Sequence, residues 1–220
     1  MENYNTPEIH LLLLKGMMQV VHTLLTQAKI EYFIDGGTLL GAVRHSDIIP
    51  HDDDIDIGIS HQDYIEKLPS LFPAIENYKL QVGETKFPLS IETDPNNIIV
   101  KVYIKDMWYK TSHKLVGTPT LDIFSWLKGK NKIILTNPAQ RKQFPNCYYL
   151  TSEMYPLKLY KFGQFEFWGA NEPMGYLNRY YGEDCIKTAK IEVRDPNPIN
   201  LLNKSTKVLS FPLGLDPLAQ

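Results

Sequence analysis

The sequence predicts an α/β (α+β) fold in which helices flank a β-sheet, and three observations support this prediction. Apolar residues near the N-terminus recur at the helical period. The middle of the chain, residues 79–135, holds short apolar segments separated by turn residues. A hairpin pattern and then a short helical pattern follow between residues 157 and 182. A chain of 220 residues is long enough for one substantial core.

The first predicted helix begins at Thr6 and Pro7, since threonine caps helices well and proline fits the first helical position. Its apolar stripe consists of Leu13, Met17, Val21, Leu24 and Ala28. Packing in the core explains this stripe better than a membrane or a partner helix does.

The next elements surround a glycine-rich turn. Residues 31–34 form a short predicted strand that leads into Asp35-Gly36-Gly37. Thr38 is expected to cap a short helix over residues 39–44. After a turn, the chain enters an acidic strand over residues 54–59, and a helix over residues 62–71 follows.

The remaining elements are strands, a hairpin and a final helix. The predicted strands cover residues 79–82, 89–93, 98–104, 121–126 and 132–135. A hairpin pairs residues 157–162 with 165–168 across Gly163-Gln164, and Pro173 opens a helix that Gly182 ends. Residues 1–190 therefore form one predicted catalytic domain. Residues 191–220, which contain several prolines, form a predicted irregular tail.

Composition excludes several classes of function. The net charge of −2 does not support generic nucleic-acid binding by a basic face. Cys147 and Cys185 form no CxxC pair, and no Cys/His cluster has the spacing of a zinc site. The longest uninterrupted apolar run near the N-terminus is Leu11 to Leu14, and no signal-peptide layout is present. We therefore expect a soluble, cytoplasmic protein without a membrane span.

The acidic strand carries the chemistry of the chain. Alternation along the strand places Asp54 and Asp56 on one face and Ile55, Ile57 and Ile59 on the other. Two neighbouring carboxylates repel each other unless a cation or solvent intervenes, and Mg²⁺ prefers carboxylate and phosphate oxygens. Together with the glycine turn, which lets a backbone approach a phosphate, the pair predicts a metal-assisted phosphoryl-transfer site.

The same stretch resembles the LicD/fukutin family. The family pattern stands here as Gly36-Gly37-Thr38, Leu39-Leu40-Gly41-Ala42-Val43-Arg44-His45, Ile49-Pro50-His51-Asp52 and Asp54-Ile55-Asp56. Further similarity runs from residue 155 through residue 182, and His51 departs from the family, many of whose members have tryptophan there. The resemblance implies a nucleotidyltransferase-like mixed β-sheet flanked by helices, with a C-terminal β-hairpin and short helix.

A site of this kind needs a third carboxylate on a later strand. Asp122, within Thr120-Leu121-Asp122-Ile123-Phe124, fits this position. The resemblance therefore implies that Asp54, Asp56 and Asp122 are the catalytic residues and the ligands of Mg²⁺ or Mn²⁺. Solvated charges on an edge strand are the competing explanation for Asp54 and Asp56. Asp52 is expected to brace the turn, and Asp53 to point to the opposite face.

Four residues are expected to bind the substrate: Gly36, Gly37, Thr38 and Arg44. The glycines could also serve only a tight turn, and Arg44 could pair with Asp47 at the surface. His45 and His51 could act as general bases or make structural hydrogen bonds. Lys101, Lys105, Lys158 and Lys161 could contact phosphate, and the sequence does not choose among them.

The resemblance implies a donor activated by CDP, with choline or ribitol as the known alcohols, and a glycan as acceptor. The transferred group would be the phospho-alcohol, and CMP would be released. Two alternatives remain open at this point: transfer of a nucleotide from an NTP, and a non-catalytic module that binds a nucleotide or a glycan.

Overall fold

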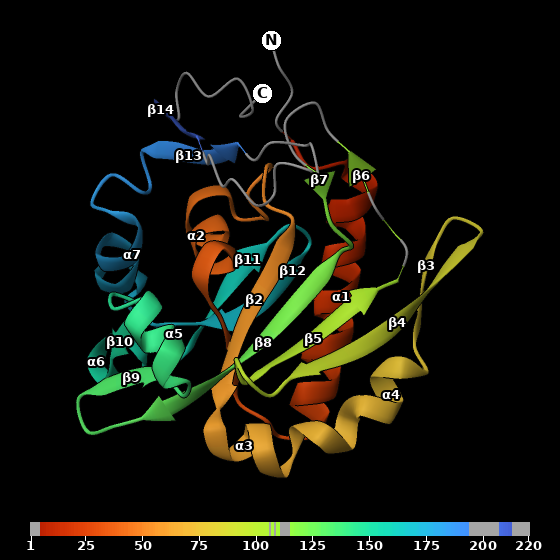
Figure 1. Ribbon diagram of the computed structural model, residues 1–220, viewed down its shortest axis with the longest axis horizontal. Helices are drawn as coiled ribbons and strands as arrows, with labels where there is room; N and C mark the ends of the chain where they lie inside the picture. Colours follow the sequence, from red (N-terminus) through yellow and green to blue (C-terminus); the bar gives the residue numbers. More distant parts are fainter. Residues whose placement is uncertain (1–4, 106, 108, 111–114, 194–206, 213–220) are drawn as a thin grey trace.

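The computed structural model describes residues 5–105, 107, 109–110, 115–193 and 207–212. Its centre is a mixed sheet (Figure 1) whose main strands follow one another in space as β1 (Tyr32–Ile34), β2 (Asp54–Ser60), β8 (Thr120–Lys128), β5 (Ile99–Ile104), β4 (Thr85–Asp94) and β3 (Lys79–Val82). Strand β9 (Lys132–Leu135) pairs with β8, and β10 (Tyr148–Leu150) pairs with β9. Strands β2 and β8 run parallel, whereas the other pairs in this sheet are antiparallel.

Helices flank this sheet, as the sequence predicts. They are α1 (Glu8–Gln27), α2 (Gly36–His45), α3 (His61–Glu66), the 3-10 helix η1 (Leu68–Leu71), α4 (Phe72–Glu76), α5 (Pro138–Gln143), α6 (Thr151–Met154) and α7 (Pro173–Tyr181). Helix α1 lies behind β5 and β8 in Figure 1. The predicted hairpin is β11 (Lys158–Phe162) with β12 (Phe165–Gly169), and α7 is the predicted short helix after it. The predicted fold class is therefore confirmed.

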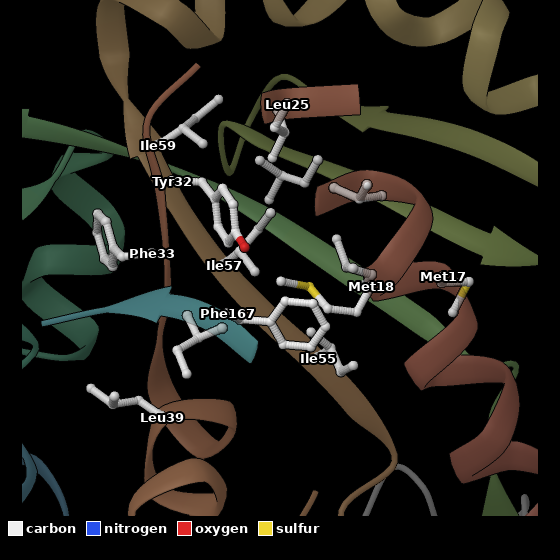
Figure 2. Close-up of a cluster of buried hydrophobic side chains, with 14 of the residues drawn as sticks. Met17, Met18, Leu25, Tyr32, Phe33, Leu39, Ile55, Ile57, Ile59 and Phe167 are labelled. Atoms are coloured by element: carbon white, nitrogen blue, oxygen red, sulfur yellow. The ribbon is translucent and has the colours of Figure 1, made fainter. Parts of the chain in front are cut away.

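The core fills the space between α1 and the sheet. Met17 and Met18 of α1 belong to one buried cluster with Ile55 and Ile57 of β2 and Phe167 of β12, and Figure 2 shows Met18 near Phe167. All five side chains are fully buried. Burial of this size contributes roughly 1.5–3 kcal/mol for each large apolar side chain. Because side chains alternate along a strand, the aspartates of β2 lie on the face opposite this core.

The bounds of three predicted helices differ from those in the structure. Helix α1 begins at Glu8 with Pro7 at its N-cap position, so Thr6 is not the cap. Helix α2 begins at Gly36 with Asp35 at the N-cap position, so Thr38 lies inside the helix. The helix expected over residues 62–71 is divided into α3 and η1, because Pro69 disfavours a continuous α-helix at this point.

The C-terminal segment contains regular structure that the sequence did not reveal. Strand β13 (Thr188–Val193) pairs antiparallel with β14 (Lys207–Pro212). The expectation of an irregular tail is therefore wrong for these residues, whereas residues 194–206 and 213–220 lie outside the described part of the chain. A further two-stranded pair is formed by β6 (Tyr109–Lys110) and β7 (Leu115–Val116). The division of the chain at residue 190 stays a prediction.

Helix α1 also bears on the expected absence of a membrane span. By length and composition it is apolar enough to cross a membrane, contrary to the expectation that no segment approaches this limit. It lies near the N-terminus, and part of its surface packs in the core described above. Core helices of soluble proteins and signal sequences share these properties, so α1 is weak evidence for a membrane.

Candidate active site

Three neighbouring strands bring charged residues from distant parts of the chain to one face of the sheet. The parallel register of β2 and β8 pairs Asp56 with Asp122 and Asp54 with Thr120. The antiparallel register of β8 and β5 pairs Asp122 with Lys101. Residues opposite each other in neighbouring strands share a face, and so do residues two apart in one strand. The three aspartates predicted to act together therefore lie on one face.

Asp56 lies at the centre of the negative charge. Burial raises the pKa of Asp56 well above its ordinary value, and the charges of Asp54, Asp122, Asp35 and Asp52 raise it further. Each of these carboxylates is therefore near enough to oppose ionisation of Asp56. Like charges thus crowd around Asp56, and a bound cation would relieve their repulsion.

One lysine offsets part of this charge. The Nζ of Lys101 lies 2.9 Å from Oδ2 and 3.2 Å from Oδ1 of Asp122. Burial lowers the pKa of Lys101, but its hydrogen bond to Asp122 and the charges of Asp122, Asp54 and Asp56 outweigh burial and raise it. Burial and the charge of Glu92 together raise the pKa of Asp122, although Lys101 lowers it. Lys101 is thus the one among the four lysines named from the sequence that contacts a predicted metal ligand.

A compact group of carboxylates lies at the entry of β2. One oxygen from each of Asp52, Asp53 and Asp54 lies within 4.8 Å of the others. The expectation that Asp53 points to the opposite face is therefore wrong, because the strand begins only at Asp54 and alternation does not extend to Asp53. Asp52 accepts a hydrogen bond from the backbone N–H of Asp53 at 3.2 Å, as expected of a residue that braces the turn.

The glycine turn makes room for carboxylates. Gly36 has a φ of +53°, in the left-handed region that favours glycine. A Cβ atom there would lie 2.8 Å from Oδ2 of Asp56, and one on Gly37 would lie 2.7 Å from Oδ2 of Asp52. The hydroxyl oxygen of Tyr181 would lie 3.6 Å from the same Cβ on Gly36. In this structure the close approach is to carboxylates, and contact of the two glycines with phosphate stays a prediction.

Thr38 connects the helix to the acidic strand. Its Oγ1 accepts a hydrogen bond of 2.8 Å from the backbone N–H of Asp56. The N–H of Asp35 donates to the carbonyl of Asp56 at 3.0 Å, so both backbone groups of Asp56 are bound to this turn. These bonds fix the position of the Asp56 carboxylate. A direct contact of Thr38 with substrate stays a prediction.

Arg44 lies at the other end of α2. Its Nη1 donates hydrogen bonds to the carbonyls of Cys185, at 2.9 Å, and Thr188, at 3.2 Å. At 1.5 Å per residue, Arg44 lies about 12 Å along the helix axis from Gly36. Asp47, the competing partner proposed from the sequence, forms an ion pair with Lys15 at 2.7 Å. These contacts tie α2 to the first residue of β13 and to the segment before it, and phosphate binding by Arg44 stays a prediction.

Two residues that the sequence did not single out adjoin the site. Asp35 is buried and accepts a hydrogen bond of 2.7 Å from the hydroxyl of Tyr149, which stacks on Tyr176 at 4.0 Å. Burial raises the pKa of Asp35, and the hydrogen bond from Tyr149 offsets part of that rise. Tyr181, in the last turn of α7, lies over the glycine turn. The Tyr-Gly pattern at residues 181–182 was the available signal for Tyr181.

Comparisons with known proteins match this site and the sheet around it. The model of the LicD family, described as LicD/FKTN/FKRP, nucleotidyltransferase domain, matches residues 29–171. The uncharacterized protein RP689 of Rickettsia prowazekii is 41% identical over 206 residues, which are 91% of this chain and 66% of that protein. The chain spans 61% of a second rickettsial relative, the uncharacterized protein RT0683 of Rickettsia typhi. The chain is thus shorter than both relatives.

Two relatives with named activities are similar over shorter stretches. The lipopolysaccharide cholinephosphotransferase LicD of Haemophilus influenzae is 36% identical over 70 residues, which are 31% of this chain and 26% of that protein. The human ribitol 5-phosphate transferase FKRP is 45% identical over 58 residues, which are 26% of this chain and 12% of that protein. Among solved structures, the lincosamide adenylyltransferase LnuA has a TM-score of 0.42 and 14% identity, and covers 83% of this chain and 97% of its own.

Proposed function

The chain belongs to the LicD family, and from this premise we propose that it is a metal-dependent phosphotransferase. It would move a phospho-alcohol, of the phosphocholine or ribitol phosphate type, from a CDP-activated donor to a hydroxyl of a glycan. The observation that carries the proposal is the pairing of Asp56 with Asp122 across β2 and β8, beside the glycine turn. The names of the relatives LicD, a cholinephosphotransferase, and FKRP, a ribitol 5-phosphate transferase, support the class of transferred group.

The donor set fits a divalent cation. Carboxylate oxygens are the ligands that Mg²⁺ and Mn²⁺ prefer, and the raised pKa of Asp56 reflects its burial and the negative charges of the neighbouring carboxylates. Asp54, Asp56 and Asp122 would hold the ion, and Asp52 and Asp53 lie at the entry of the same strand. When bound, the ion neutralises the charge on the phosphates of the donor.

The residues of the chain would supply position and electrostatics. The acceptor hydroxyl attacks the phosphorus that carries the alcohol, a new P–O bond forms to the glycan, and the P–O bond to CMP breaks. The first intrahelical bond of α2 runs from the N–H of Leu39 to the carbonyl of Asp35, so the N–H groups of Gly37 and Thr38, which precede it, would be the ones to bind a phosphate of the donor. Thr38 and Asp35 hold the backbone of Asp56 in place.

A donor screen tests this proposal. The protein is incubated with Mg²⁺ or Mn²⁺ and with CDP-choline, CDP-ribitol or CTP, and thermal stability and released nucleotide are measured with and without a glycan acceptor. A donor present at 100 times its dissociation constant should add about 2.7 kcal/mol to the free energy of unfolding. CMP release that depends on the acceptor would support the proposal. Asp122→Asn should abolish release, whereas Glu76→Gln, which removes an exposed charge from α4, should not.

Other outcomes would favour the competing functions. Release of pyrophosphate from CTP would show nucleotide transfer, in which the acceptor attacks the α-phosphorus. Binding of a nucleotide or glycan with no turnover in the presence of either metal would indicate a non-catalytic module.

A further inference from the structure

We propose that Lys101 is an internal counter-ion of the metal site. An incoming divalent cation displaces the ammonium of Lys101 from Asp122, and this ammonium then pairs with Glu92. This inference rests on the proposed function, because it requires a cation at Asp122.

The ion pair between Lys101 and Asp122 occupies the carboxylate that the cation would need. A single ammonium lies within hydrogen-bond distance of both oxygens of Asp122, at 2.9 and 3.2 Å. The side chain of Asp122 is only 12% exposed, so few directions of approach to it remain open. A divalent cation and an ammonium on the same carboxylate repel each other, so binding of one at Asp122 disfavours the other.

Lys101 is able to move when it is displaced. Its side chain is 36% exposed, and lysine has a flexible stem of four carbons. The ammonium therefore reaches toward solvent without disturbing the buried strand around it. Val100 and Val102, its neighbours along β5, are buried and keep the backbone in place.

Glu92 is positioned to receive the displaced ammonium. The antiparallel register of β4 and β5 places Glu92 directly opposite Lys101, on the same face of the sheet. Lys101 therefore lies between two carboxylates, with Asp122 on one neighbouring strand and Glu92 on the other. Glu92 is exposed, and its charge contributes to the raised pKa of Asp122. A cation at Asp122 would thus move the ammonium of Lys101 away from Asp122 and toward the exposed Glu92.

The central experiment measures the affinity of the metal for variants of Lys101. Mn²⁺ alone is titrated calorimetrically into the wild type, Lys101→Met, Lys101→Arg and Lys105→Met. Lys101→Met keeps the apolar stem and removes the competitor, so Mn²⁺ should bind about tenfold more tightly, in line with the strength of hydrogen bonds to charged groups. Lys101→Arg keeps a cation on Asp122 and should bind Mn²⁺ as the wild type does. Lys105, an exposed lysine just after β5, is the matched control and should have no effect.

A double-mutant cycle tests the part of Glu92. Glu92→Gln alone should weaken Mn²⁺ binding about two- to fivefold, because the displaced lysine loses its second partner. A change of this size corresponds to the free energy of an exposed ion pair. In the Lys101→Met background the same change should have a clearly smaller effect, limited to that of a distant charge. An equal effect in both backgrounds would show that Glu92 acts only as a nearby charge and would overturn the transfer of Lys101 to it.

The outcomes separate this inference from the proposed function. A wild type that binds no Mn²⁺ would overturn the metal site and this inference together. A wild type that binds Mn²⁺ while Lys101→Met binds it equally or more weakly would overturn the inference alone. If Lys101→Met fails to fold by circular dichroism, Lys101→Gln takes its place with the same expected result.

Discussion

Two charged regions of the molecule differ in how their charges are arranged. Where α6 meets α7, Arg179 donates hydrogen bonds to both carboxylate oxygens of Glu153, at 2.7 and 3.2 Å. On the face of β2 and β8, by contrast, Asp56 lies among four other carboxylates. Glu153 also accepts the N–H of Leu150 at 2.8 Å, and Arg179 donates to the carbonyl of Tyr148 at 2.8 Å. Charge in the first region is matched by charge. In the second region burial and like charges raise the pKa of Asp56.

The difference indicates what each region does. Matched and partly buried charges hold elements together, since removal of one partner leaves the other desolvated and unpaired. Crowded like charges reduce the stability of the metal-free fold, and a protein keeps them where a ligand supplies the missing charge. Glu153 with Arg179 is thus a structural pair, and the acidic face is the proposed metal site.

The largest expected effect is on activity and comes from Asp56→Asn. Transfer should fall about a thousandfold, because a metal ligand supplies several kcal/mol to the transition state. The metal-free protein should unfold at the same or a higher urea concentration, because a crowded charge is removed. Initial rates and urea titrations measure the two effects. An unfolded variant, or one with the turnover of the wild type, would contradict the assignment of Asp56.

The structural pair should show the opposite behaviour. Arg179→Met should lower the free energy of unfolding by about 2–3 kcal/mol, since Glu153 would remain partly buried without its partner. The pair of Asp63 in α3 with the exposed Lys67 after it is the control. Asp63 keeps a hydrogen bond from the hydroxyl of Ser60 when Lys67 is removed, so Lys67→Met should cost less than about 1 kcal/mol. Urea unfolding measures both. Equal costs for the two variants would remove the contrast on which the comparison depends.

The dependence of stability on pH sharpens the comparison further. A carboxyl whose pKa is raised on folding, as for Asp56, keeps its proton in the folded state above its unfolded pKa of about 4. The folded state then binds more protons than the unfolded state, so the contribution of Asp56 to stability grows as the pH falls from 7 toward 5. Over this pH range, the free energy of unfolding should rise by about 1.4 kcal/mol for each pH unit in which Asp56 is protonated in the folded state and ionised in the unfolded state.

Urea unfolding at pH 7, 6 and 5 measures this contribution as the difference between the wild type and Asp56→Asn. Saturating Mn²⁺ should remove the difference in slope, because the ion takes the place of the proton. Identical pH dependence of the two metal-free proteins would contradict a raised pKa at Asp56.

The smallest expected effect concerns Arg44. Arg44→Ala removes two hydrogen bonds to backbone carbonyls and should lower the free energy of unfolding by about 1–2 kcal/mol. Titration with CDP in the presence of Mn²⁺ tests the competing role in phosphate binding. A tenfold or larger loss of CDP affinity with unchanged stability would assign Arg44 to the donor site instead.

The sequence by itself determined those features that depend on local periodicity and local chemistry. Alternation placed Asp54 and Asp56 on one face of β2, and the three isoleucines between and after them on the buried face. The hairpin at Gly163 and the helix after Pro173 followed from turn and helix-start residues. Such patterns involve residues that are close in the sequence, so they can be recognised without knowing which strands become neighbours in the sheet.

The tertiary structure alone decided the features that depend on register and on contacts between distant residues. The parallel pairing of β2 with β8 set Asp122 beside Asp56, and the pairing of β8 with β5 chose Lys101 from four candidate lysines. The two backbone carbonyls that Arg44 binds belong to residues more than 140 positions later in the chain, and the pairing of β13 with β14 spans a segment with little periodicity. No local pattern encodes such partners, because a strand carries the same alternation whichever strand lies beside it.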